Sequence, residues 1–239
     1  MAQHPVVVYG ASGYTGMLIM DWLIDQRIPF TAVGRSAGRI KEMMAQRVVR
    51  LESAIYEIIE CNHDVESLTR AFKGAKVVCN TVGPFAHFGK ESIQAALRAG
   101  CHIVDTTGEQ EYIRRARDEF GESFREAGLV FAPSTSYMYT FSEIAAELAL
   151  ETRGIDSLET AALCRASRDG SSGVTVGSTA SIFDCFRHEQ YYLWEKELVA
   201  HPPSTSFDVV DPNFIHPVFS VPWGGTSLPI FYQHDARVR

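Results

Sequence analysis

Glycines spaced to hold a phosphate lie close to the start of the chain. Gly10, Gly13 and Gly16 follow an apolar run at residues 5–9 and precede an apolar stretch at residues 17–22. This order predicts a buried strand, a tight turn and the start of a helix. Glycines let the backbone approach a bound group closely, and a helix N-terminus favours an anion such as a pyrophosphate. The alternative is a glycine-rich turn that holds no ligand.

We favour a dinucleotide site because both flanks of the turn fit one. The spacing Gly-x-x-Gly-x-x-Gly indicates such a site only between a strand and a helix, and both are expected here. The residues predicted to hold the diphosphate are Gly10, Ser12, Gly13, Tyr14, Thr15 and Gly16.

The end of the second expected strand indicates which dinucleotide binds. A carboxylate at this point would hold the two ribose hydroxyls, whereas an arginine accommodates a 2′-phosphate. The chain has Arg35 there, with Ser36 and Arg39 behind it and no carboxylate before Glu42. These residues predict NADP(H) rather than NAD(H). The alternative is a solvent-exposed arginine at the start of a helix.

A second group of residues should lie along the cofactor towards its nicotinamide. The apolar strand expected at residues 76–82 breaks at a Gly-Pro pair, and ligand crevices open at the carboxyl ends of parallel strands. We expect contacts from Asn80, Thr81, Val82, Gly83, Pro84 and Phe85.

The elements that position these residues alternate along the chain. Strands are expected at residues 5–9, 29–33, 54–61, 76–82, 101–105 and 129–132, with helices between them, the fourth of which starts at residue 89. This alternation predicts an α/β fold with a Rossmann-type, doubly wound parallel sheet covered on both faces. We assign this NADP-binding domain to residues 1–134.

A smaller α+β domain for substrate binding or dimerisation is expected at residues 135–239. Its elements are predicted as helices at residues 141–152 and 178–199 and strands at residues 158–163 and 230–232. This domain has too few strands to close a sheet by itself, so it is expected to be incomplete at its C-terminus. Either a partner chain in a homodimer or further residues could complete its sheet.

Composition excludes several other classes of protein. A net charge of −7 over 239 residues argues against a binder of nucleic-acid phosphates. No apolar run is long enough to span a membrane. Five separated cysteines and no targeting segment before the first strand predict a cytoplasmic protein. No histidine or cysteine pair has metal-ligand spacing, so no metal site is expected.

Four segments together resemble the saccharopine-dehydrogenase-like oxidoreductases, a family that includes trans-acting enoyl reductases. They are the glycine turn, Gly34-Arg35, the segment from Asn80 to Phe85, and the segment from Asp105 to Glu109. A weaker match at residues 177–181 resembles the start of a helix in the family's second domain. The resemblance implies an NADP(H)-dependent oxidoreductase, and it adds Thr107 to the cofactor-binding residues.

One departure from the family bears on the chemistry. The family carries Phe-Asp-Ser-x-Pro-Ser-Asp after its sixth strand, where this chain has Tyr-Met-Tyr-Thr-Phe-Ser-Glu at residues 137–143. The family's aspartate, first serine and proline are therefore replaced.

The catalytic residues stay unassigned at this level. A reduction needs a proton donor, and each candidate has a structural alternative: helix capping, packing or plain exposure. The candidates are Glu109, Tyr137, Tyr139, His87, and Tyr192 with Lys196, which would share one face of a helix.

Two functions follow from these observations. The first is an NADP(H)-dependent oxidoreductase that transfers hydride to a C=C, C=O or C=N bond of a small or carrier-bound substrate. The second is a non-catalytic NADP(H)-binding sensor or assembly protein.

Overall fold

The chain forms two compact units. The computed structural model describes residues 1–163, 176–210, 217–222 and 227–239. The first unit comprises Met1–Thr107 and Arg115–Pro133, and the second comprises Gly108–Arg114 and Ser134–Arg239.

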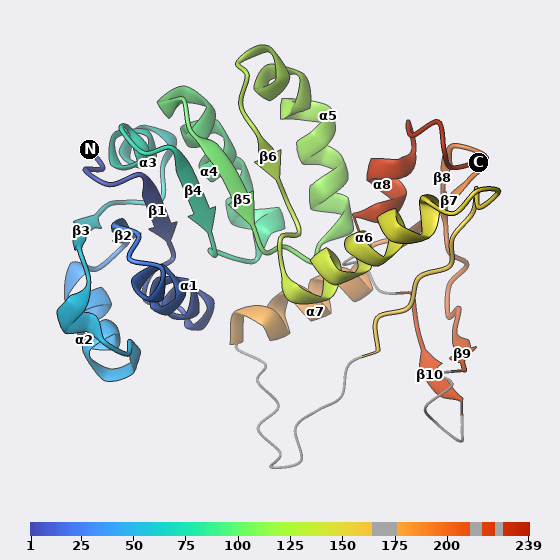
Figure 1. Ribbon diagram of the computed structural model, residues 1–239, viewed down its shortest axis with the longest axis horizontal. Coiled ribbons are helices and arrows are strands. Elements are labelled where there is room, and N and C mark those ends of the chain that lie inside the picture. Colours follow the sequence, from blue (N-terminus) through green and yellow to red (C-terminus); the bar gives the residue numbers. More distant parts are fainter. Residues whose placement is uncertain (164–175, 211–216, 223–226) are drawn as a thin grey trace. The chain divides into compact units, whose positions relative to one another are not determined.

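A parallel sheet forms the centre of the first unit (Figure 1). Its six strands lie in the order β3-β2-β1-β4-β5-β6, and every neighbouring pair is parallel. This is the Rossmann strand order, so the predicted fold class is confirmed. The strands are β1 (Val6–Tyr9), β2 (Phe30–Gly34), β3 (Tyr56–Glu60), β4 (Val77–Asn80), β5 (His102–Asp105) and β6 (Phe131–Ala132).

Helices connect consecutive strands of this sheet. They are α1 (Tyr14–Asp25), α2 (Ala37–Arg47), α3 (Val65–Phe72), α4 (Phe85–Ala99) and α5 (Gln110–Glu126), with a short 3-10 turn at Leu51–Ser53. Helix α4 begins four residues before the predicted start at Gly89, because Pro84 is its N-cap and a proline is tolerated there. It ends at Gly100, whose φ of 72° suits the left-handed region.

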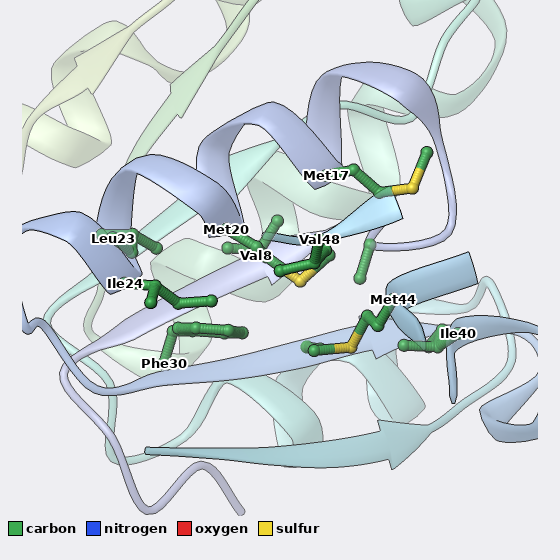
Figure 2. Packing of buried hydrophobic residues seen from close by; sticks show 11 residues of the cluster. Val8, Met17, Met20, Leu23, Ile24, Phe30, Ile40, Met44 and Val48 are labelled. Atoms are coloured by element: carbon green, nitrogen blue, oxygen red, sulfur yellow. The ribbon is translucent and has the colours of Figure 1, made fainter. Parts of the chain in front are cut away.

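Two helices are held on one face of the sheet by a shared apolar core (Figure 2). Val8 and Phe30 of the sheet pack with Met20 of α1 and with Ile40 and Met44 of α2, and all are fully or almost fully buried. Side chains alternate along a strand, so Tyr9 points to the opposite face, where it contacts Phe72 of α3. This packing fixes the strand ends and helix starts that carry the predicted site.

The second unit combines helices with two small antiparallel sheets. Its elements are α6 (Tyr137–Leu150), α7 (Val176–Arg187), β7 (Tyr191–Trp194), β8 (Glu197–Ala200), β9 (Phe207–Val209), β10 (Val218–Ser220) and α8 (Leu228–Tyr232). Strand β7 pairs with β8 and β9 with β10. Ala146 and Leu150 of α6 pack against Leu228 and Tyr232 of α8.

The predicted helix at residues 178–199 is wrong in its second half. Helix α7 ends at Arg187, and β7 and β8 form a hairpin whose two turn residues, Glu195 and Lys196, have φ of 49° and 70°. Positive φ at both turn positions matches the twist of a tight hairpin. The alternation of side chains along the two strands therefore prevails over the helical spacing of the aromatic residues.

The other two predicted strands of this unit are also wrong. Residues 158–163 form no strand. Residues 230–232 lie in α8, where Ile230 is 1% exposed. Because this segment is helical, it offers no strand edge to a second copy, and it no longer supports the expected homodimer.

Candidate cofactor site

The glycine turn forms a cradle that has no room for side chains. A Cβ atom on Gly16 would lie 2.5 Å from the carbonyl oxygen of Gly10, and one on Gly13 would lie 3.1 Å from it. Gly10 has φ of 90°, and a Cβ there would lie 2.5 Å from Oγ1 of Thr81. Gly10 and Gly16 therefore require glycine and Gly13 leaves little room for a side chain, and the turn brings the end of β1 against the end of β4.

The start of α1 presents backbone donors rather than side-chain caps. Gly13 is the N-cap and supplies no side-chain hydrogen bond. Its carbonyl accepts from the Met17 amide at 3.0 Å, and its own amide donates to the Gly10 carbonyl at 2.8 Å. No acidic residue lies in the first turn, so the positive end of the helix is suited to an external anion. Ser12, Tyr14 and Thr15 are exposed or half-buried around it.

Arg35 stands exposed directly after β2. Ser36 is the N-cap of α2, and its hydroxyl accepts from the Arg39 amide at 3.2 Å. The Arg39 side chain is exposed in the same first turn. The three residues predicted to bind the 2′-phosphate thus lie together at the start of α2. The Ser36 hydroxyl already accepts a hydrogen bond from this helix.

The end of β4 carries a buried polar atom with an open hydrogen-bonding position. Asn80 is fully buried, and its Oδ1 accepts from the Val82 amide at 3.0 Å. Its Nδ2 has no hydrogen-bond partner within the described part of the chain. A buried donor without a partner is costly, so this atom fits a cofactor acceptor. Thr81 is fixed beside it, because its hydroxyl donates to the Tyr9 carbonyl at 2.9 Å.

The remaining predicted residues lie along the same edge of the sheet. Gly83 and Pro84 are half-buried, and the buried Phe85 folds back so that its ring would lie 3.3 Å from a Cβ on Gly83. Thr107 follows β5, and its amide donates to Oδ1 of Asp105 at 3.0 Å. Since parallel strands share one carboxyl edge, the segments after β1, β2, β4 and β5 gather there. Their contacts with a cofactor stay predictions.

A partly buried cluster next to the glycine turn was not predicted from the sequence. The Tyr9 hydroxyl lies 2.6 Å from Nδ1 of His63, and Nε2 of His63 lies 3.5 Å from Oε2 of Glu91 on α4. Burial and the nearby Cys61 raise the pKa of Tyr9, which Arg35 partly offsets. Tyr9 therefore keeps its proton, and its hydroxyl shares a hydrogen bond with Nδ1 of His63. These residues are far apart in the sequence, and only the strand order brings them together.

The candidate proton donors occupy different surroundings. In the second unit, Oε1 of the buried Glu109 accepts from the Ser181 hydroxyl at 2.8 Å, and the Tyr139 hydroxyl would lie 2.3 Å from a Cβ on Gly108. Tyr137 is exposed. In the first unit, His87 is exposed beside Phe88.

Cys185 of the second unit is a structural thiol. Its Sγ donates to the Gly108 carbonyl at 3.4 Å. Burial, Glu109 and Asp184 raise its pKa to about 12, so it is protonated at neutral pH.

Tyr192 and Lys196 do not form the pair that their spacing predicts. Tyr192 lies in β7, opposite Val199, and Lys196 lies in the hairpin turn. A Tyr-x-x-x-Lys pair needs a helix to place both side chains on one face. The predicted arrangement of Tyr192 and Lys196 on one helix face is therefore wrong.

The structure describes residues 1–163, 176–210, 217–222 and 227–239. Within these ranges, no group of three or more histidine, cysteine, aspartate or glutamate side chains is placed to hold a metal ion. No helix there is both long and apolar enough to cross a membrane.

Comparison with known proteins identifies two family models along the chain. The model described as the saccharopine dehydrogenase NADP binding domain matches residues 6–130. A model described as a family of unknown function matches residues 140–239.

Individual relatives match between about half and three quarters of this chain. A lipid droplet localized protein of Caenorhabditis elegans is 30% identical over 54% of this chain and 32% of its own length. A saccharopine dehydrogenase-like oxidoreductase of Mus musculus is 28% identical over 55% of this chain and 34% of its own. A Mycobacterium tuberculosis protein assigned as a trans-acting enoyl reductase is 27% identical over 75% of this chain and 44% of its own.

The chain thus spans less than half the length of each of these relatives. The glycine cradle, the unpartnered Asn80 amide and the exposed Arg35 fit the dinucleotide that the matching family model names. The chain belongs to the saccharopine dehydrogenase NADP-binding domain family, and its cofactor is NADP(H).

Proposed function

We propose that this protein is an NADP(H)-dependent oxidoreductase that transfers hydride to a C=C, C=O or C=N bond of a small or carrier-bound substrate. The observation that carries the proposal is the glycine cradle at the uncapped start of α1, with Arg35 one strand away. The family assignment and the reductase names of its relatives add support.

Each predicted residue has a definite part in this proposal. When bound, NADPH supplies the hydride. The segment from Gly10 to Gly16 would hold the diphosphate with backbone amides, and Arg35, Ser36 and Arg39 would hold the 2′-phosphate. Asn80 would donate from its free Nδ2, beside Thr107 and the other residues after β4.

Reduction also needs a proton, and Glu109 and Tyr139 stay candidates for its donor. Tyr139 and Glu109 share the surroundings of Gly108. Replacing Tyr139 with phenylalanine removes only a hydroxyl. If Tyr139 donates the proton, this variant binds NADPH normally but loses turnover, typically by a factor of about 10²–10⁴.

The 2′-phosphate assignment is tested with Arg35→Ala. A charge-assisted hydrogen bond is lost, so NADPH affinity should fall by about 1.5–3 kcal/mol while NADH affinity barely moves. Both affinities are measured by fluorescence titration. Arg47→Ala, at the exposed far end of α2, is the matched control and should change neither. Equal losses of NADPH and NADH affinity in Arg35→Ala would contradict the assignment.

Turnover separates the proposal from the non-catalytic alternative. The test is NADPH oxidation with a panel of enoyl, keto and imine substrates, each free and carrier-bound. Saturable oxidation with one member supports the oxidoreductase. A protein that binds NADPH tightly and turns over no member would favour a sensor or assembly role.

A cytoplasmic location also belongs to the proposal. It is supported by five cysteines that are scattered along the chain without Cys-x-x-Cys pairs. Because one relative is named for lipid droplets, imaging of the tagged protein beside a droplet stain is the direct test. Concentration on droplets would contradict the proposed location.

A further inference from the structure

A carboxylate of this chain occupies the start of α2. Glu60 is the last residue of β3 and pairs with Gly34, the last residue of β2. Its Oε2 accepts from the Ala37 amide at 2.7 Å. A further hydrogen bond joins β2 and β3 here, because the Cys61 amide donates to the Gly34 carbonyl at 3.0 Å.

The Ala37 amide, which Glu60 binds, is also a favourable donor for an external anion. Ala37 is the first residue of α2, so its N–H has no partner within the helix and lies at the positive end of the helix dipole. The Ser36 hydroxyl serves the Arg39 amide. An internal negative charge therefore lies on the short segment from Arg35 to Arg39, to which the proposed function assigns the 2′-phosphate.

We propose that Glu60 is a specificity-determining residue that weakens binding of the 2′-phosphate. This inference rests on the proposed function, which places the phosphate at Arg35. A phosphate dianion and a carboxylate at one helix start repel each other, and both draw on the same positive charges. NADH lacks this phosphate and escapes most of the penalty. Glu60 thereby lowers the ratio of NADPH affinity to NADH affinity at this site.

The charge of Glu60 can be separated from its hydrogen bond. Glutamine has the same shape and keeps an acceptor oxygen for the Ala37 amide, but it carries no charge. Aspartate keeps the charge on a side chain that is shorter by one methylene. Glu60 is exposed, so both substitutions should preserve the fold, which circular dichroism checks.

Glu57 provides a matched control on the same strand. Its carboxylate accepts from the Thr31 hydroxyl at 2.7 Å, and it lies three residues, or about 10 Å, from Glu60 along β3. Glu57→Gln changes the net charge by the same amount as Glu60→Gln. The charge that it removes lies more than a Debye length from Glu60 at physiological salt.

The experiment is a fluorescence titration of the full chain with NADPH and with NADH. Glu60→Gln should tighten NADPH binding about three- to tenfold and change NADH binding less than about twofold. The gain should shrink at high salt, which a purely structural effect would not do. Glu57→Gln and Glu60→Asp should leave the NADPH-to-NADH ratio near that of the parent protein.

Three results would overturn the inference. One is an unchanged NADPH-to-NADH ratio in Glu60→Gln. The second is the same change in Glu60→Asp, which keeps the charge, as in Glu60→Gln, which would show that the effect does not come from the charge of Glu60. The third is a loss of NADH affinity, which would mean that Glu60 holds the ribose hydroxyls. If Arg35→Ala still acts selectively on NADPH, the proposed function survives any of these results.

Discussion

At the scale of single residues, the predicted cofactor site depends on two crowded positions. Gly16 lies against the backbone of the turn that precedes it, and the buried Nδ2 of Asn80 has no partner among the described residues. Both features follow from residue type, and the sequence predicted both residues as part of the site. Tyr9, His63 and Glu60 could not be found in this way, because their partners come from strands that are distant in the sequence.

The first prediction concerns Gly16. In Gly16→Ala the new Cβ would meet backbone atoms at 2.5 and 3.0 Å, so the turn must open. We expect a loss of about 1–3 kcal/mol in the free energy of unfolding together with a loss of NADPH binding. Urea denaturation and fluorescence titration measure the two effects.

Gly121→Ala is the control for this variant. A Cβ on Gly121 meets only the Arg117 side chain, at 3.8 Å, and Gly121 lies in α5, away from the predicted cofactor residues. It should be neutral or stabilise the protein by up to about 1 kcal/mol. If Gly16→Ala binds NADPH as tightly as the parent protein, the glycine turn does not hold the cofactor as proposed.

The second prediction concerns Tyr9. Tyr9→Phe removes the hydroxyl that shares a hydrogen bond with Nδ1 of His63, at a cost of about 1 kcal/mol at neutral pH. Tyr56→Phe, on the exposed side of β3, should cost less than about 0.5 kcal/mol. Equal losses in the two variants would show that the Tyr9–His63 bond contributes nothing to stability.

Tyr9 also gives the protein a dependence on alkaline pH. Burial raises its pKa in the folded state above the ordinary 10.0, so its contribution is complete below pH 10 and is lost as the pH rises further. Urea denaturation above pH 10 should therefore show a shallower decline in Tyr9→Phe than in the parent protein. Parallel declines would contradict this assignment.

At the scale of elements, regular alternation was easy to predict and short aromatic segments were not. The strands and helices of the first unit follow apolar runs and caps that the sequence displays, such as Asp64, whose carboxylate accepts from the Ser67 amide at the start of α3. The hairpin at residues 191–200 has aromatic residues at helical spacing as well as in alternation. Two positive φ values at its turn decide between the two patterns, and no strong turn pair such as Asn-Gly marks them.

Glu195→Asn tests the hairpin by the sign of its effect. Asparagine tolerates a positive φ better than glutamate, so the hairpin should gain a few tenths of a kcal/mol up to about 1 kcal/mol. In a helix the same change would be destabilising. Glu197→Asn, on β8, is the control and should be neutral or slightly destabilising. Urea denaturation measures the change in the free energy of unfolding for both variants. A loss of stability in Glu195→Asn would contradict the hairpin turn.

At the scale of the whole molecule, the sequence predicted the first unit far better than the second. Rossmann units are built from local strand–helix repeats, and each repeat carries its own pattern. The second unit joins distant pieces, for example α6 with α8 near the C-terminus and the Gln110 side chain with the backbone of Tyr191 at 2.7 and 3.1 Å. Such long-range contacts leave no periodic trace, which explains why its strands were misplaced.

The central claim is that the start of α1 holds a dinucleotide diphosphate while Arg35 holds the ribose phosphate. A fluorescence titration of the purified protein with NADPH and NADH tests it most directly. The account predicts saturable binding of both nucleotides, with a clearly lower Kd for NADPH. No saturable binding, or the same Kd for the two nucleotides, would contradict it.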